Sequence, residues 1–66
     1  MRISYHESED ALFIRLDEGA IIESEEVQPG LIIDFNSNGQ PVGFEVRGAK
    51  THLPGANLKQ IGFEVA

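Results

Sequence analysis

The chain has 66 residues, no cysteine and a formal net charge of −6, from eleven acidic and five basic side chains. So short a chain forms one domain with a thin core, because it buries only roughly 60% of the surface that its unfolded form exposes. Without disulfides or thiolate metal sites, its stability must come from packing, from regular hairpins or from a partner subunit. The acidic balance argues against direct nucleic-acid binding, which depends on Lys and Arg displacing counterions from phosphates.

The sequence also lacks the signals of a membrane or secreted protein. No apolar stretch approaches the roughly 18 residues that a membrane-spanning helix needs. The first residues, Met1–Tyr5, alternate like a strand and lack the apolar run of a signal peptide. We therefore expect a cytoplasmic protein that makes no membrane contact.

Two short alternating segments predict a first hairpin, with strands over Arg2–Tyr5 and Ala11–Leu16 joined by a polar connector. Leu12 and Ile14 then lie on one face of the second strand, while Phe13 lies on the other. A third strand is predicted over Ala20–Val27. Both of its faces carry charge, which is typical of an edge strand protected from aggregation.

The clearest hairpin signal follows the Pro29-Gly30 turn. Leu31–Phe35 and Val42–Arg47 alternate on either side of the turn-forming run Asn36–Gly39, which predicts two antiparallel strands. One face of this hairpin is apolar and is expected to point to the core: Leu31, Ile33, Phe35, Val42, Phe44 and Val46.

The C-terminal part is less regular. The spacing of Leu58 and Ile61 predicts a helical turn over Asn57–Ile61. The segment Ile61–Val65, IGFEV, nearly repeats Val42–Val46, VGFEV, so Gly62–Ala66 is a competent strand, either in its own chain or on a partner's sheet edge. Together these elements predict a single β-rich α+β domain over residues 1–66, an antiparallel meander of about five strands with a short C-terminal helical turn.

The pattern as a whole resembles an uncharacterised bacterial family, domain of unknown function 2283. The resemblance covers about Arg2 to Leu53, and its most specific pieces are the D-A-L-x-I-x-L strand at Asp10–Leu16 and the P-G-L-I-I-D hairpin start at Pro29–Asp34. It implies a small β-rich domain with a short C-terminal helix. Because some members are thought to be encoded beside small basic toxin-like proteins of the ribonuclease class, it also implies an antitoxin or immunity-type role.

Candidate chemistry is sparse. His6, Glu7, Glu9 and Asp10 could in principle bind a divalent cation, but their spacing matches no recognised ligand motif, and a solvated turn explains them better. His52 has no neighbouring nucleophile or orienting acid in the sequence. We therefore predict no enzyme activity, no catalytic residues, no metal site and no cofactor.

The sequence offers four candidate partner-binding residues: Phe13, Glu23, Glu25 and Glu26. The glutamates could bind Arg or Lys of a partner, and Phe13 is an aromatic residue on the face opposite to Leu12. The first hypothesis is a non-enzymatic protein-interaction module, antitoxin-like, that neutralises a basic protein. The alternatives are a structural homodimeric domain and a protein that binds a divalent metal or a small molecule.

Overall fold

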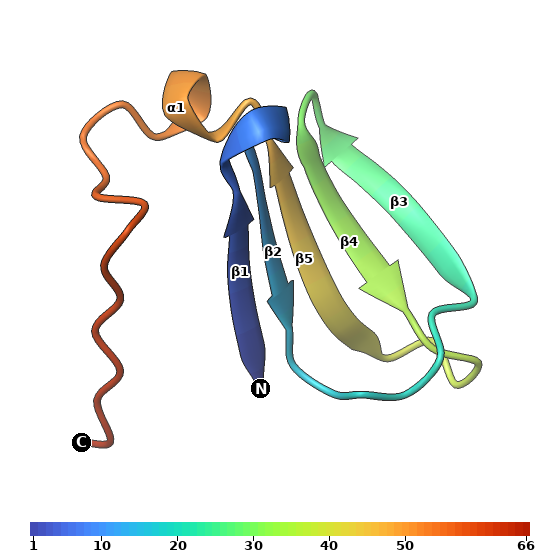
Figure 1. Cartoon of the computed structure of the whole chain (residues 1–66). Helices are drawn as coiled ribbons and strands as arrows, with labels where there is room; N and C mark the ends of the chain where they lie inside the picture. Colours follow the sequence, from blue (N-terminus) through green and yellow to red (C-terminus); the bar gives the residue numbers. More distant parts are fainter.

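A computed structural model describes every residue from Met1 to Ala66. Its elements are five strands, one short 3-10 helix and one short α-helix (Figure 1). In chain order they are β1 (Arg2–His6), η1 (Glu7–Glu9), β2 (Ala11–Arg15), β3 (Glu23–Gln28), β4 (Leu31–Phe35), β5 (Pro41–Arg47) and α1 (Ala49–His52). No helix is long and apolar enough to cross a membrane.

The five strands form one sheet in the order β1-β2-β5-β4-β3, with every neighbouring pair antiparallel. The predicted five-stranded antiparallel sheet with a short helix is thus confirmed. The strand order differs from a simple meander, because β5 pairs with β2 as well as with β4. This position suits its sequence: Phe44 pairs with Ile14 on one side and with Ile33 on the other, whereas the charged β3 is left at the edge.

The hairpin of β4 and β5 has the predicted turn. The Asn36 carboxamide oxygen accepts the backbone N–H groups of Asn38 and Gln40, both at 3.0 Å. At the other end of β4, Gly30 has a φ of 84°, as a type II turn demands at its third position. A side chain at Gly30 would also meet His52, because an added Cβ would lie 2.6 Å from its Nε2 atom.

Most predicted strand ends differ from the observed ones by no more than one residue, the strand predicted over Gly62–Ala66 does not form, and two predictions are corrected further. β3 begins at Glu23 rather than at Ala20, since the preceding residues belong to the connection that crosses from β2 to the opposite edge of the sheet. The α-helix is Ala49–His52 rather than Asn57–Ile61, where only a turn forms, with the Gln60 N–H donating to the Asn57 carbonyl at 3.2 Å.

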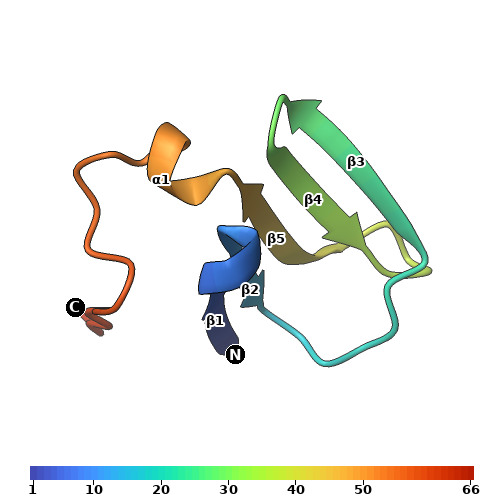
Figure 2. The ribbon, with the colours of Figure 1, turned by 45° about the horizontal axis from the view of Figure 1, so that its top comes forward.

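Asp10, which lies 40 positions before Lys50, determines the position of α1. The Asp10 carbonyl accepts the N–H of Ala49 at 3.0 Å, and its carboxylate accepts the N–H of Lys50 at 3.1 Å. A carboxylate on free N–H groups stabilises the start of a helix. Asp10 therefore holds α1 at one end of the sheet, beside η1, rather than over a face (Figures 1 and 2).

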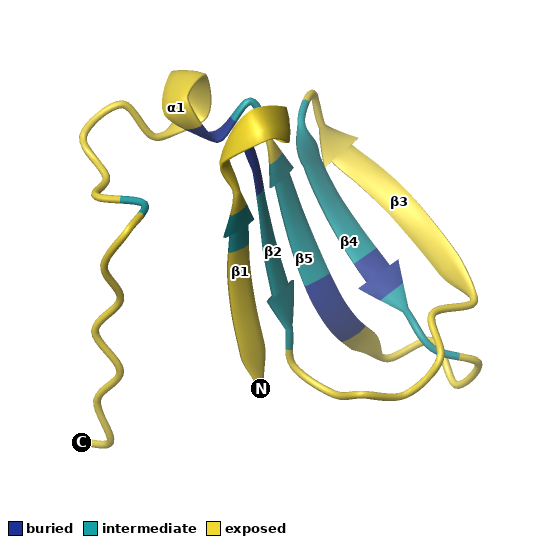
Figure 3. Ribbon diagram, viewed as in Figure 1, coloured by how far each residue is buried: buried dark blue, intermediate teal, exposed yellow.

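Very few residues of the fold are fully buried. Only 5 of the 66 residues are buried, and none of these is a large side chain. They are Ala11, Asp34, Val42, Gly43 and Ala49. The central strands β2, β4 and β5 are mostly partly buried, while β3 is exposed along its whole length (Figure 3). The sheet is thus a single layer.

Candidate functional site

One face of the sheet is apolar across four strands. The strand register aligns Ile3, Ile14, Phe44 and Ile33 in one row and Tyr5, Leu12, Val46 and Leu31 in the next. Directly paired residues share a face of a sheet. We call this surface the apolar face: Ile3, Tyr5, Leu12, Ile14, Leu31, Ile33, Phe44 and Val46.

No second layer covers the apolar face. Its central residues are only partly buried, and Ile3 on β1 is 37% exposed. The segment after α1 passes beside β1 and leaves an apolar groove of about 670 Å³ between itself and the sheet. Leu12 and Ile14 line this groove on the sheet side, and Leu53 and Leu58 line it on the other. Globular domains bury such a face against another layer, so this surface is unfinished within one chain.

The C-terminal segment is itself apolar and exposed. Ile61, Phe63 and Val65 alternate along it, with exposed fractions of 58%, 74% and 89%. The segment is linked to the body by an ion pair of 3.0 Å between Lys59 and Glu7. The hydrogen bond from Lys59 and the positive charge of this lysine lower the pKa of the Glu7 carboxyl below its ordinary value.

The three predicted glutamates lie on β3, which is an edge strand as the sequence predicted. We call them the acidic edge: Glu23, Glu25 and Glu26. All three are exposed, and none belongs to an ion pair. Glu23 and Glu25 pair with Phe35 and Ile33 and so stand at the margin of the apolar face, while Glu26 pairs with Ile32 and lies on the opposite face.

Phe13 does not lie near the acidic edge. It is on β2, with β5 and β4 between it and β3, and it pairs with Glu45 on the face opposite to the apolar one. Its ring is partly buried: His6 contacts it edge-on at 5.0 Å between centroids, and the Arg47 guanidinium lies 5.8 Å from the centroid. The four predicted partner-binding residues therefore occupy two separate places.

The face that carries Phe13, which we call the polar face, satisfies its own charges and hydrogen bonds. Ser24 donates to the buried Asp34 carboxylate at 2.6 Å, and Arg47 pairs with Glu45 at 3.0 Å. Burial raises the pKa of the Glu45 carboxyl, and the neighbouring Asp34 carboxylate raises it further.

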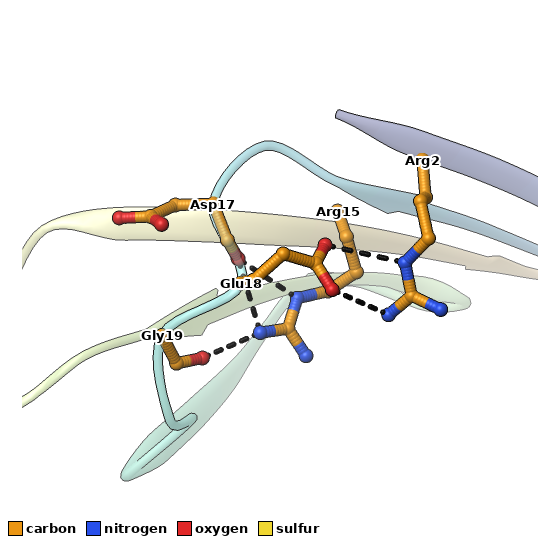
Figure 4. A network of polar contacts seen from close by, with 5 residues as sticks. All are labelled: Arg2, Arg15, Asp17, Glu18 and Gly19. Carbon is orange, nitrogen blue, oxygen red and sulfur yellow. Dashed lines mark hydrogen bonds and ion pairs between the residues drawn. The ribbon is translucent and has the colours of Figure 1, made fainter.

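Two arginines hold the crossing connection at the lower end of the sheet. Arg15 donates to the carbonyl groups of Asp17 and Gly19, and Arg2 pairs with Glu18 at 3.0 Å (Figure 4). These contacts fold the connection back on the strands that it leaves. They are structural contacts and leave both guanidinium groups engaged.

The acidic connector between β1 and β2 is also engaged in structural contacts. Asp10 accepts the Tyr5 hydroxyl at 2.6 Å in addition to its contacts with α1, and His6 lies 3.8 Å from Glu9. The hydrogen bond to Asp10 raises the pKa of Tyr5 to about 12. No group of three or more His, Asp or Glu side chains is placed to hold a metal ion.

Sequence reasoning identified the acidic edge but missed the apolar face as a surface. It assigned the apolar hairpin residues to a core, because alternation shows which side chains share a face and not what covers them. The signal that was available is size: a chain of 66 residues with one short helix has little material for a second layer.

Comparison with known proteins assigns the chain to a family. No curated protein and no solved structure matches the chain. The family described as "Protein of unknown function (DUF2283)" matches residues 2–50, which include all five strands of the sheet and the start of α1. The chain therefore belongs to the DUF2283 family.

Proposed function

We propose that the chain is a non-enzymatic protein-interaction module and that the apolar face is its main binding surface. The observation that carries this proposal is the single-layered sheet, which leaves eight apolar positions on four strands without a covering layer. Large apolar patches on small domains commonly mark protein-binding surfaces. The titratable groups that could have served chemistry, such as Asp10 and Glu7, are committed to Tyr5, Lys50 and Lys59 instead.

The apolar face is tested as an interface by the variant Ile3→Glu. Ile3 lies on the edge strand β1 and is 37% exposed, so the sheet can still form with a charged side chain there. Burying that charge in a contact of the apolar face is unfavourable. The matched control is Ile22→Glu, at a position 65% exposed in the crossing connection. The proposal expects the complexes of the native chain to be lost with Ile3→Glu and kept with Ile22→Glu. Equal behaviour of the two variants would contradict it.

A second role, the antitoxin-like neutralisation of a basic protein, is favoured by the acidic edge. The outer side of β3 has no neighbouring strand, so its backbone groups are free to pair with an extended segment. Three unpaired glutamates on the same strand favour a segment rich in Lys or Arg. The net charge of −6 favours approach of a basic protein and disfavours approach of nucleic acid. A cytoplasmic place of action is part of this proposal.

The basic partner is tested by isolating tagged chain from its native host and identifying the bound protein by mass spectrometry. The proposal expects a small basic protein whose binding weakens as salt is raised. A triple Glu→Gln change of the acidic edge should release it. A control with the same change in net charge should retain it: Glu9→Gln, Asp17→Asn and Glu64→Gln, all at exposed positions. Release by both triples would show only a general charge effect and would contradict a role for β3.

A further inference from the structure

The apolar face is wider than any segment of one chain can cover. Neighbouring strands lie roughly 4.8 Å apart, so the four strands that carry this face span about 15–20 Å. The helix α1 lies at the end of the sheet, and the C-terminal segment is a single extended stretch about one strand wide. Even if that stretch closed onto its own sheet, it would cover about a quarter of the face. A full layer has to come from outside these 66 residues.

The solvent-exposed area of the chain indicates how much surface the covering molecule would bury. A compact monomer of 7.3 kDa exposes about 4,200 Å² by the usual scaling with mass. This chain exposes 4917 Å², about 700 Å² more than that expectation. The surplus is close to the roughly 800 Å² that each partner buries in a standard-sized protein interface. One ordinary interface per chain would bury an area of this size.

The C-terminal segment supplies an extended apolar stretch with the sequence pattern of β5. Ile61–Val65 repeats the pattern of Val42–Val46, and in β5 that pattern places Phe44 and Val46 on the apolar face. In the single chain the equivalent residues Phe63 and Val65 are 74% and 89% exposed. The groove beside β1 thus lies next to the start of an exposed apolar segment, at Ile61.

From these three observations we infer that the apolar face is covered by a second copy of this chain. The two sheets pack face to face, and the segment Ile61–Val65 of each copy lies across the β1 margin of the other copy's apolar face. The arrangement is two-fold symmetric, so each copy both gives and receives a C-terminal segment. Packed sheets lie about 10 Å apart, which leaves space for one layer of interdigitating side chains from each sheet.

The charges of the chain are compatible with this self-association. The apolar face has no carboxylate or cationic side chain among its eight residues. Glu23 and Glu25 stand at its β3 margin, where they stay in water. Two copies of charge −6 can therefore meet without placing like charges at the centre of the contact. The inference rests on the proposed function, since it names the partner of the same apolar face.

The test compares Phe63→Ser with a matched control in the full chain. Phe63 makes little contact within one copy, so the variant leaves the single chain intact and removes an interface side chain. Ile22→Ser removes an apolar side chain of 65% exposure outside the proposed contact. Sedimentation equilibrium should show that Phe63→Ser raises the dimer Kd at least about tenfold, as for an aromatic anchor of an interface. Ile22→Ser should leave the Kd within about twofold. Equal Kd values for the two variants would overturn the inference.

A second measurement shows whether the segment Ile61–Val65 packs against its own copy or against the other copy. In a sample that mixes isotope-labelled and unlabelled copies, filtered nuclear Overhauser spectra should connect the Phe63 ring of one copy with the methyl groups of Ile3 and Leu12 of the other. Contacts only within one copy would overturn the inference. A monomer at millimolar concentration that still binds a different protein through Ile3 would also overturn it, yet would leave the proposed function standing. A monomer whose complexes with other proteins survive Ile3→Glu would overturn both.

Discussion

The two faces of this sheet are formed by the same strands. One chain supplies the contacts of the polar face, but it supplies no covering layer for the apolar face. On the polar face, the Asp34 carboxylate accepts a hydrogen bond from Ser24, and Glu45 forms an ion pair with Arg47. The Phe13 ring lies between His6 and Arg47. On the apolar face, the side chains contact their neighbours along the sheet, and only the groove beside β1 is lined by another segment of the chain. Hydrogen-bonded pairs can thus be satisfied at short range within one chain, whereas an apolar face requires a covering layer of its own size.

The largest expected effect is on the apolar face, for Ile14→Ala. Ile14 pairs with Ile3 and Phe44, at the centre of that face. If a second copy buries it, the substitution should lower the free energy of unfolding by about 3 kcal/mol, as for a fully buried side chain. Urea unfolding measures this, and the midpoint of the native chain should rise with protein concentration because folding and association are linked. A loss below about 1 kcal/mol with a concentration-independent midpoint would mean that the face stays open.

The next effect is at Asp10, where the sheet meets α1. Asp10→Gly keeps the left-handed backbone, with φ at 50°, and removes the carboxylate that accepts from Tyr5 and Lys50. We expect a loss of about 1–2 kcal/mol in the free energy of unfolding, the usual range for a hydrogen-bonded capping carboxylate. Asp17→Gly is the control, because its side chain is exposed and accepts no hydrogen bond. Similar losses for both variants would show that Asp10 has no special role.

Tyr5 links the apolar face to Asp10 through its hydroxyl, and its titration gives a pH test. The folded pKa of about 12 lies above the ordinary value of 10.0, so the protonated phenol is favoured by folding. Its contribution to stability is fully present below pH 10.0 and is lost as pH rises toward about 12. Because the chain has one tyrosine and no tryptophan, ultraviolet absorbance follows this group alone. Tyr5→Phe should abolish this alkaline loss, and titration of Tyr5 near pH 10 in the folded chain would contradict the contact.

The smallest effect is expected on the polar face, at Glu45. Its raised pKa means that folding favours the protonated carboxyl, so this contribution is present at low pH and is lost as pH rises through the raised value. Asp34→Asn removes a neighbouring negative charge and should bring the pKa of Glu45 down toward its ordinary value. Carbon-13 spectra of the side-chain carboxyl groups measure this. An unchanged Glu45 titration in Asp34→Asn would exclude coupling between the two carboxyls.

The sequence predicted most of the sheet because its strands alternate and its turns carry the residues that turns require. Pro29-Gly30 and Asn36–Gly39 act locally, and both turns form where expected. The position of β5 beside β2 was not predictable in the same way, since it depends on which strand best fits between Ile14 and Ile33. Likewise α1 depends on Asp10, a residue distant in sequence, so local spacing placed the helix wrongly.

The candidate site was predicted only in part for a related reason. The acidic edge is a local property of β3, and its glutamates could be identified from charge on both faces of one strand. The apolar face is a property of four strands together, and whether it is a core or a surface depends on what lies above it. Phe13 was chosen because it faces away from Leu12. The structure then pairs it with His6 and Arg47, contacts that no local pattern indicates.

If a second copy of this chain covers the apolar face, the unmodified chain is a dimer in solution, and its mass shows this. Sedimentation equilibrium from micromolar to millimolar concentration should show a species of twice 7.3 kDa that dissociates on dilution. Its dissociation should be shifted by Phe63→Ser and not by Ile22→Ser. A constant mass of 7.3 kDa over the whole range would contradict the account.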